Sequence, residues 1–271
     1  MTVLGLGTYA YAWAIGVTGY DNPAPMDVIS FLNHAAELGF RLVQIADNLP
    51  LDELSSDELA LLLQAAQERK IAIEVGTRGI APDHLRRYLE IAKQCHSPIL
   101  RIVVDSAGHH PEPQEIITTL RPLLPEFEAA NVTLAIENHD RFQARTLAQI
   151  MQELDSPYVG ICLDTVNSFG ALEGPEVVID TLGPYVVNLH IKDFEIKRLD
   201  HNMGFALTGT PAGAGMLNIP LLLAQLHEYG RNFNAILELW PAWEGELLAT
   251  CEKEDQWARQ SVRYLRNYLK E

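Results

Sequence analysis

The stretch VTLAIENHD, residues 132–140, decides the fold because an apolar strand pattern runs directly into titratable side chains. Its first five residues have the β-branched and aliphatic composition of a buried strand. Glu137 and three more polar residues follow without a turn residue between them. A buried strand that ends in titratable residues is typical of parallel α/β folds, in which the reactive side chains lie at the carboxyl ends of the strands.

The same pattern repeats along the chain, where short β-branched runs alternate with amphipathic segments of helical length. The expected strands are Val3 to Gly7, Arg41 to Ala46, Ile71 to Val75, Ile99 to Val104, Val132 to Glu137, Val159 to Asp164, Val186 to His190 and Ala235 to Leu239. The expected helices are Pro25 to Leu38, Ser56 to Lys70, Pro82 to Gln94, Pro113 to Ala130, Leu147 to Leu154, Pro175 to Leu182, Ile219 to Tyr229 and Glu252 to Leu269. About eight βα units in a chain of this length predict an α/β fold, a single (β/α)8 barrel over residues 1–271. No G-x-G-x-x-G follows the first strand, so a dinucleotide-binding sheet has no support.

Composition narrows the classes of partner. The chain has 271 residues, 48% of them hydrophobic, and a formal net charge of −16, which opposes binding to nucleic acid or to anionic membranes. No apolar stretch reaches the roughly 20 residues of a membrane span. The three cysteines, Cys95, Cys162 and Cys251, form no C-x-x-C pair. We therefore expect a cytoplasmic protein with no disulfide framework.

Strand parity predicts a metal site. Side chains two residues apart share a face of a strand, and this places Glu137, Asp164, His190 and Glu238 inside the barrel with their aliphatic neighbours outside. Three close, buried carboxylates would repel one another unless a cation lay between them. The oxygen-rich set favours one divalent cation, Mn²⁺ or Mg²⁺, with Co²⁺ tolerated, and leaves coordination positions open.

Five motifs in order, AIENHD, CLDTVNS, NLHIKD, GAGMLN and ILELWP, resemble the xylose isomerase-like TIM-barrel superfamily of sugar isomerases and epimerases. The resemblance covers nearly the whole chain. It implies that Glu137, Asp164, His190 and Glu238 are the metal ligands, and that Glu137 and Glu238 are also catalytic, moving protons at a bound ketose. It further implies a small carbohydrate or sugar-acid substrate and allows a homo-oligomer.

The chain departs from the ketose 3-epimerase pattern at two positions. Asn167 stands where those enzymes place a substrate-contacting histidine, and Lys192 stands near the place of an arginine. Arg78, just after the third strand, can join Lys192 in binding an anion, which would suit a substrate with a carboxylate. The alternatives are a solvated loop arginine for Arg78 and a salt bridge to Asp193 or Asp140 for Lys192. Parity points Arg101 into the barrel, where we expect a structural ion pair with Glu74.

Other rim residues complete the expected substrate contacts. Tyr9 and Trp13 follow the first strand and offer aromatic faces to sugar C–H surfaces, although a hydrophobic plug is an equal alternative. Asn48 follows the second strand and is expected to form a hydrogen bond with the substrate. The short basic segment at Lys192, Lys197 and Arg198 is expected to be a loop.

Several functions use such a site. The first hypothesis is a metal-dependent isomerase or epimerase that acts through a metal-stabilised enediolate. The alternative is a metal-dependent decarboxylase or lyase acting on a 3-oxo sugar acid, since the opening segment, ADNLPL and GTRG resemble a subgroup that contains 3-oxo-isoapionate decarboxylase. A remote alternative, an endonuclease IV-like phosphodiesterase, requires more histidines and a less acidic chain. A noncatalytic sugar-binding barrel would not require two reactive glutamates.

Overall fold

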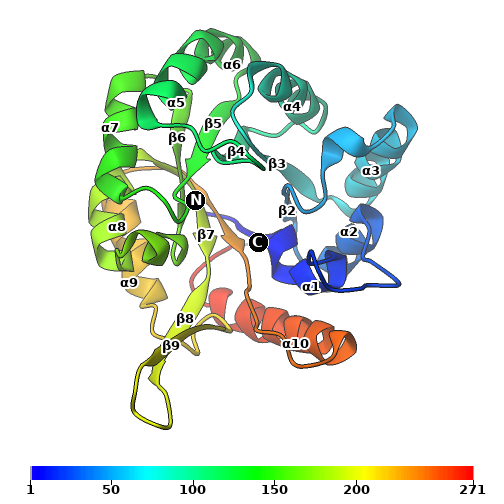
Figure 1. Cartoon of the computed structure of the whole chain (residues 1–271). Coiled ribbons are helices and arrows are strands. Elements are labelled where there is room, and N and C mark those ends of the chain that lie inside the picture. The colour runs from blue at the N-terminus through cyan, green and yellow to red at the C-terminus, as the bar shows by residue number, and fades with distance from the viewer. Residues whose placement is uncertain (1, 271) are drawn as a thin grey trace.

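The computed structural model describes residues 2–270, and its parallel strands form one closed barrel in the order β1-β10-β7-β6-β5-β4-β3-β2 (Figure 1). The barrel strands are β1 (Leu4–Gly7), β2 (Leu42–Ile45), β3 (Ala72–Arg78), β4 (Ile99–Val103), β5 (Thr133–Glu137), β6 (Val159–Asp164), β7 (Val186–Ile191) and β10 (Asn234–Leu237). β1 pairs with both β2 and β10, so the first and last barrel strands close the ring. The predicted (β/α)8 barrel is confirmed.

Helices surround the barrel (Figure 1). They are α1 (Ala12–Ile15), α2 (Val28–Glu37), α3 (Ser56–Arg69), α4 (Pro82–Gln94), α5 (Pro113–Leu120), α6 (Leu124–Ala130), α7 (Ala144–Leu154), α8 (Pro175–Leu182), α9 (Ile219–Glu228) and α10 (Leu247–Leu265). The single helix predicted from Pro113 to Ala130 divides into α5 and α6 around a 3-10 turn, Arg121–Leu123. Pro122 and Pro125 lie at this division, where each lacks the N–H that a continuous helix would need.

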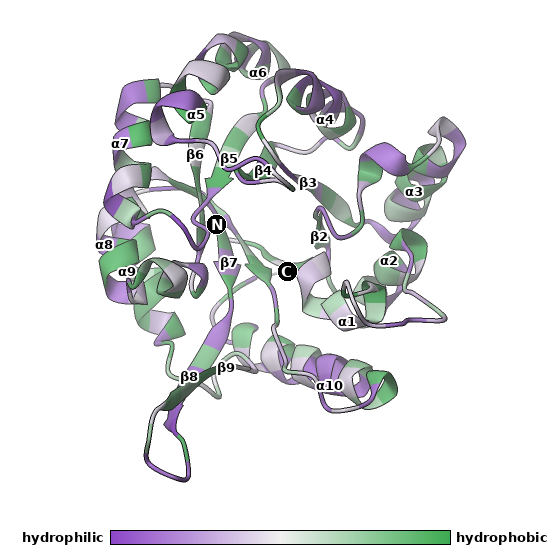
Figure 2. Cartoon of the chain, in the orientation of Figure 1, coloured by the Kyte–Doolittle hydropathy of each residue, from purple (hydrophilic) through white to green (hydrophobic). Residues whose placement is uncertain are grey.

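Local chemistry explains where several helices begin. Ser55 accepts a hydrogen bond from the backbone N–H of Glu58, whose side chain accepts one from the Ser55 N–H, and this capping box starts α3. Proline occupies the first turn of α4 and of α8, where no intrahelical N–H is required. The strands are mostly hydrophobic and the helices are mixed, as Figure 2 shows. The helices therefore bury one face against the barrel.

A β-hairpin projects from the barrel where the sequence analysis expected a loop. β8 (Asp193–Arg198) pairs antiparallel with β9 (Phe205–Thr210), so the loop prediction for the segment of Lys197 and Arg198 is wrong. Both strands are buried at the base of the hairpin and more exposed toward its tip, so the pairing has no continuous buried face, and the interrupted charge pattern hid it. At its base Asp193 accepts hydrogen bonds from the backbone N–H groups of Gly213, Gly215 and Leu217, which folds the glycine-rich segment back onto β8.

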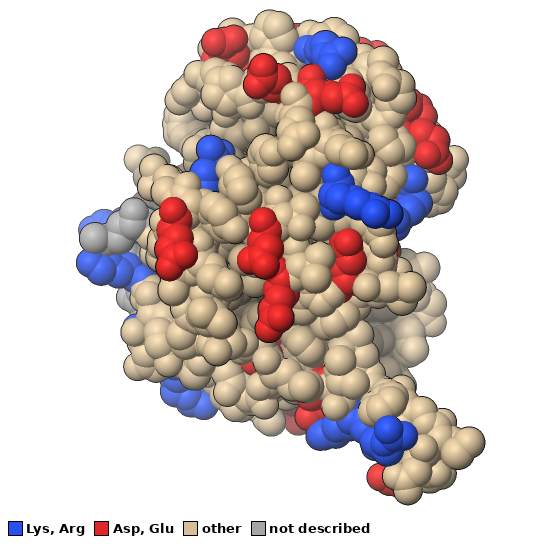
Figure 3. Space-filling model, turned by 90° about the vertical axis from the view of Figure 1, so that its left-hand side faces the viewer, with Lys and Arg blue, Asp and Glu red and all other residues tan. Residues whose placement is uncertain are grey.

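The surface carries charges of both signs, and several of them form ion pairs, such as Arg86 with Glu126 at 2.9 Å. Figure 3 shows acidic and basic side chains scattered over one face, with basic residues on the projecting hairpin. Among residues 2–270 no helix has the length and apolar character needed to cross a bilayer. Cys95, Cys162 and Cys251 are free thiols.

Candidate metal centre

Four neighbouring strands bring the predicted ligands together. Glu137 and Asp164 are the last residues of β5 and β6, His190 lies in β7, and Glu238 directly follows β10. His190 is in register with Asp164 on one side and with Ile236 on the other. All four candidate ligands are 0–1% exposed. Strand parity thus placed them correctly at one end of the barrel.

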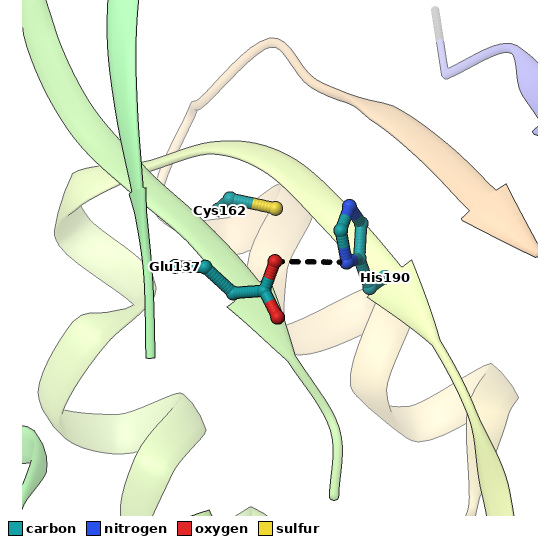
Figure 4. A group of neighbouring side chains, drawn as sticks. All are labelled: Glu137, Cys162 and His190. Atoms are coloured by element: carbon teal, nitrogen blue, oxygen red, sulfur yellow. Dashed lines mark ion pairs between the residues drawn. The ribbon is translucent and has the colours of Figure 1, made fainter. Parts of the chain in front are cut away.

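The His190 ring is the centre of this cluster. Its Nδ1 lies 3.3 Å from Glu137 Oε2, 3.4 Å from Glu238 Oε1 and 3.9 Å from Asp164 Oδ2. Figure 4 shows Glu137 and His190 facing each other, with the Cys162 thiol beside them. The potential ligand atoms of Asp164, His190 and Glu238 lie within 4.8 Å of one another, and so do those of Glu137, Cys162 and His190.

Several atoms in this cluster are buried without a hydrogen-bond partner. They are His190 Nδ1 and Glu238 Oε1, together with Asp164 Oδ2 and Glu238 Oε2, which accept no hydrogen bond of good geometry although each lies 2.8 Å from the Lys192 ammonium. Buried polar atoms are normally satisfied, so a group of orphaned atoms that converge calls for an explanation. Carboxylate oxygens and an imidazole nitrogen are ligands for a hard or borderline divalent cation. The residues present therefore fit such a cation.

Lys192 contributes a positive charge to the same cluster. Its Nζ lies 2.8 Å from Asp164 Oδ2 and 2.8 Å from Glu238 Oε2, so it pairs with two candidate ligands and not with Asp193 or Asp140. Burial lowers the pKa of Lys192, but the surrounding carboxylates outweigh this and raise it well above its usual value. Burial raises the pKa of Glu238, whereas neighbouring positive charges, those of Lys192 and Arg101 among them, lower it to about 2. Both side chains are charged near neutral pH.

Glu137 is held from two sides. Asn167 Nδ2 donates to Glu137 Oε1 at 2.7 Å, and Arg101 Nε donates to Glu137 Oε2. Arg101 also pairs through Nη1 with Asp47 Oδ1 at 2.9 Å. The predicted ion pair between Arg101 and Glu74 is therefore wrong. Arg101 extends toward the carboxyl ends of the strands, whereas Glu74 lies deeper in the barrel.

Asp164 is positioned by hydrogen bonds from its neighbours. Asn138 Oδ1 accepts from the Asp164 backbone N–H at 2.7 Å, and Asn138 Nδ2 donates to the Asp164 carbonyl at 2.9 Å. The N–H groups of Val166 and Asn167 donate to Asp164 Oδ1, each at 2.8 Å. Oδ1 is thus occupied and Oδ2 is directed toward the cluster.

A polar layer beneath the cluster was not predicted as part of the site. Gln44 lies 2.7 Å from His190 Nε2, through Oε1, and Asn188 and Asn234 join it around the carboxylate of Glu74. Burial raises the pKa of Glu74, and the hydrogen bonds from these amides oppose the rise. The signal was visible in the sequence, because Gln44 and Asn188 are polar residues in the middle of otherwise apolar strands.

The predicted rim residues divide into two groups. Tyr9 and Arg78 both contact Asp47 Oδ2 at 3.0 Å, and through Asp47 they connect to Arg101 and the cluster. The sequence analysis did not predict that Asp47 connects these residues, although an acidic residue two positions after the end of β2 was a signal for it. Asn48 Oδ1 accepts from Thr8 at 2.6 Å, while its Nδ2 is buried without a partner and remains available to donate.

Trp13 belongs to a separate aromatic group. Its ring centroid lies 4.8 Å from that of Tyr20 and 5.2 Å from that of Trp243, and its Nε1 donates to the Pro241 carbonyl. The backbone N–H of Trp13 donates to Glu254 Oε1 at 2.8 Å, which ties the segment after β1 to α10. These contacts match the hydrophobic plug that was the alternative for Trp13.

Comparisons with known proteins agree with this architecture. Residues 32–268 match the family described as xylose isomerase-like TIM barrel. The chain is 38% identical over 262 residues to 3-oxo-isoapionate decarboxylase of Pectobacterium atrosepticum, covering 97% of this chain and 94% of that one.

Solved structures resemble this chain at lower sequence identity. D-psicose 3-epimerase of Clostridium cellulolyticum H10, solved with D-tagatose, aligns with a TM-score of 0.73 and 17% identity over 99% of this chain and 100% of that chain. A xylose isomerase-like TIM barrel protein of Mycobacterium smegmatis, in complex with magnesium, gives a TM-score of 0.67 and 14% identity over 97% of each chain. At such identities the likeness is one of fold.

Proposed function

The chain belongs to the xylose isomerase-like TIM-barrel family, and from this premise we propose that it is a divalent-metal-dependent decarboxylase of a 3-oxo sugar acid such as 3-oxo-isoapionate. The sequence analysis placed this reaction second, after isomerisation or epimerisation. The order changes because the relative named as a decarboxylase shares 38% identity over 97% of this chain. The epimerase structures share the fold alone.

One geometric observation carries the proposal. Lys192 Nζ lies among the candidate ligands, 2.8 Å from Asp164 and 2.8 Å from Glu238, and its side chain is only 12% exposed. A cation bound by those carboxylates would compete with the ammonium for the same oxygens. The ammonium would then be left buried beside the site and would favour an anionic partner, which a substrate carboxylate supplies.

The ligand set assigns residues to the cation. Glu137, Asp164, His190 and Glu238 would hold it, and their oxygen-rich chemistry favours Mn²⁺ or Mg²⁺, with Co²⁺ tolerated. When bound, the cation supplies the positive charge that stabilises the enediolate left by departing carbon dioxide.

The remaining residues bind the substrate and transfer the proton. Lys192 and Arg78 bind the substrate carboxylate, and the Asn48 amide and Tyr9 hydroxyl meet its hydroxyl groups at the rim. Cleavage of the C–C bond to the carboxylate releases carbon dioxide, and the bonding electron pair moves into the neighbouring carbonyl. A proton taken up from water through Glu137 or Glu238 is then delivered to that carbon. Asn167 and Arg101 orient Glu137 for this role.

Isomerisation or epimerisation is the second candidate, and a specific observation favours it. Glu137 and Glu238 lie on either side of His190, at 3.3 and 3.4 Å from Nδ1, so two carboxylates could serve as a base and an acid. Asn167, which hydrogen-bonds Glu137, occupies the place of the substrate-contacting histidine of 3-epimerases and weighs against this reaction.

Proton NMR in deuterated water separates the two reactions. The Mg²⁺-loaded protein is incubated with 3-oxo-isoapionate, other 3-oxo sugar acids and a panel of neutral ketoses. Loss of carbon dioxide, with deuterium on the carbon that carried it, is the expected result. Isomer formation from a ketose, with deuterium beside an intact carbonyl, would establish the second candidate instead. Glu137→Gln and a sample treated with a chelator are the controls, and undiminished turnover in either would overturn the assigned roles.

The setting of the enzyme is part of the same proposal. The three free thiols suit the reducing cytoplasm expected from the sequence. Besides the divalent cation, a small sugar acid is the partner that this reaction requires.

A further inference from the structure

Beneath the candidate ligands, a buried carboxylate sets the direction of a chain of hydrogen bonds. Glu74 is 1% exposed and accepts from three amides: Asn234 Nδ2 at 2.7 Å on Oε1, and Gln44 Nε2 at 3.1 Å and Asn188 Nδ2 at 2.9 Å on Oε2. In all three contacts the carboxyl oxygens of Glu74 are the acceptors, so each amide turns its NH₂ group toward Glu74. Glu74 therefore fixes which way its neighbouring amides point.

The contact with Glu74 also determines the orientation of the Gln44 amide. The Gln44 NH₂ group donates to Glu74 Oε2 and also to Asn188 Oδ1, at 3.0 Å. Asn188 can offer Oδ1 to Gln44 because its own NH₂ group is committed to Glu74. Both hydrogens of the Gln44 amide are thus used, and its Oε1 is left to face His190 Nε2 at 2.7 Å.

An oxygen acceptor at that distance requires a hydrogen on His190 Nε2. A neutral imidazole carries one N–H, so Nδ1 then keeps its lone pair, and Nδ1 is the atom that faces Glu137, Asp164 and Glu238. We propose that Gln44, held by Glu74, is a positioning residue that fixes the tautomer and ring orientation of His190 so that Nδ1 is the metal-binding atom. The inference rests on the metal centre of the proposed function.

The positioning matters because the carboxylates favour the wrong tautomer. Three acceptor groups surround Nδ1, and without Gln44 they would draw the single imidazole proton to that atom. An N–H at Nδ1 would block the lone pair that a cation needs. Partners that orient a ligating histidine in this way commonly change metal affinity by about 10- to 100-fold when removed.

Metal affinity measured without turnover tests the inference. Mn²⁺ binding is followed by electron paramagnetic resonance in the full-length wild type, in Gln44→Met and in Gln44→Glu. Gln44→Met removes the acceptor and is expected to weaken binding about 10- to 100-fold. Gln44→Glu is expected to stay near the wild type, since the introduced carboxyl can share one proton with Glu74 and still accept from His190.

A spectroscopic readout accompanies the titration. In metal-free ¹⁵N-histidine-labelled protein, the His190 signal, assigned with His190→Asn, should show the hydrogen on Nε2. Glu74→Met should populate both tautomers, and an unchanged ratio would overturn the part assigned to Glu74. A hydrogen on Nδ1 in the wild type would overturn the whole inference.

A matched variant separates positioning from stability. Ser97 is also buried in polar contact within the barrel wall, accepting from the Val75 N–H at 3.2 Å and donating to the Ile99 carbonyl at 2.6 Å. Ser97→Ala should lower stability without changing Mn²⁺ affinity, and an equal loss of affinity there would refute the positioning role. Normal binding by Gln44→Met refutes this inference alone, whereas absence of Mn²⁺ binding in the wild type overturns the proposed metal centre together with it.

Discussion

Replacing Arg101 with methionine should destabilise the fold strongly, even though methionine fills a similar length of the barrel. Arg101 has a side chain only 3% exposed and pairs with Glu137, 1% exposed, and with Asp47, 15% exposed. Without the guanidinium, Glu137 keeps its hydrogen bond from Asn167 but faces other carboxylates with no cation on Oε2. Breaking a buried pair in this way costs about 3–5 kcal/mol. The loss of Arg101 destabilises Asp47 less than Glu137, because Arg78 and Tyr9 still contact Asp47.

Urea unfolding at pH 7, with a chelator present, measures this cost by linear extrapolation. Arg78→Met is the matched control: Arg78 pairs with the same Asp47, but its side chain is 40% exposed, so its loss should cost at most about 1 kcal/mol. The double variant Arg101→Met/Glu137→Gln should lose less than the sum of the single variants, by about 1–3 kcal/mol. A cost below about 1 kcal/mol for Arg101→Met, or strict additivity in the double variant, would refute the reasoning.

The acid side of the stability curve gives an independent check on the same ion pairs. Burial raises the pKa of Asp47, but the charges of Arg101 and Arg78 outweigh it and hold the pKa below 3.8. A depressed folded-state pKa stabilises the fold above pH 3.8, and this contribution is lost as the pH falls through the folded-state value. Arg101→Met should therefore flatten the acid limb of the curve, and an unchanged slope would count against the assignment.

Four further variants test the site and its surroundings. Glu137→Gln and Glu238→Gln should each lower kcat by about 10²- to 10⁴-fold in steady-state assays with saturating Mn²⁺, and wild-type kcat in both would remove their proton-transfer role. Lys192→Met should raise KM for the sugar acid about 10- to 100-fold through loss of a charged hydrogen bond, and an unaltered KM would contradict carboxylate binding there. Burial raises the pKa of Glu254 to about 7 despite hydrogen bonds from two backbone N–H groups, so the wild type should lose stability as the pH rises from about 4.5 to 7. Glu254→Gln should remove that decline in thermal melts at pH 5 and 8, and parallel curves for the two proteins would exclude Glu254 as its source.

The sequence predicted the barrel and its four candidate ligands because both follow from short-range rules. Alternation along a strand is a property of neighbouring residues, and parallel strands must bring their carboxyl ends to the same rim. The position of Glu137 in VTLAIENHD could therefore be inferred without knowledge of its partners. The division of the predicted Pro113 to Ala130 helix was also visible in principle, because Pro122 and Pro125 were in the sequence.

Partner choice inside the barrel could not be predicted in this way. Arg101 and Glu74 share the barrel interior, but whether they meet depends on the stagger between strands and on how far each side chain reaches along the axis. Glu74 is satisfied by amides from β2, β7 and β10, which lie up to 160 residues away in sequence. The antiparallel pairing of β8 with β9 was missed because its strands carry charged and apolar residues together, with no buried face to reveal the alternation.

The position of Glu238 beside the strand that closes the barrel has a consequence for how the protein is made. Its backbone N–H donates to the Ile191 carbonyl at 3.2 Å, and the next N–H, of Leu239, reaches the Tyr9 carbonyl at 3.4 Å. The Glu238 carboxylate therefore reaches the cluster only when β10 and the residues after it pair with β7 and with the segment that follows β1. During synthesis the ribosome must release almost the whole barrel before that carboxylate can arrive. A nascent chain stalled before β10 holds an incomplete cluster, so in the cell cation capture and ring closure would be completed together.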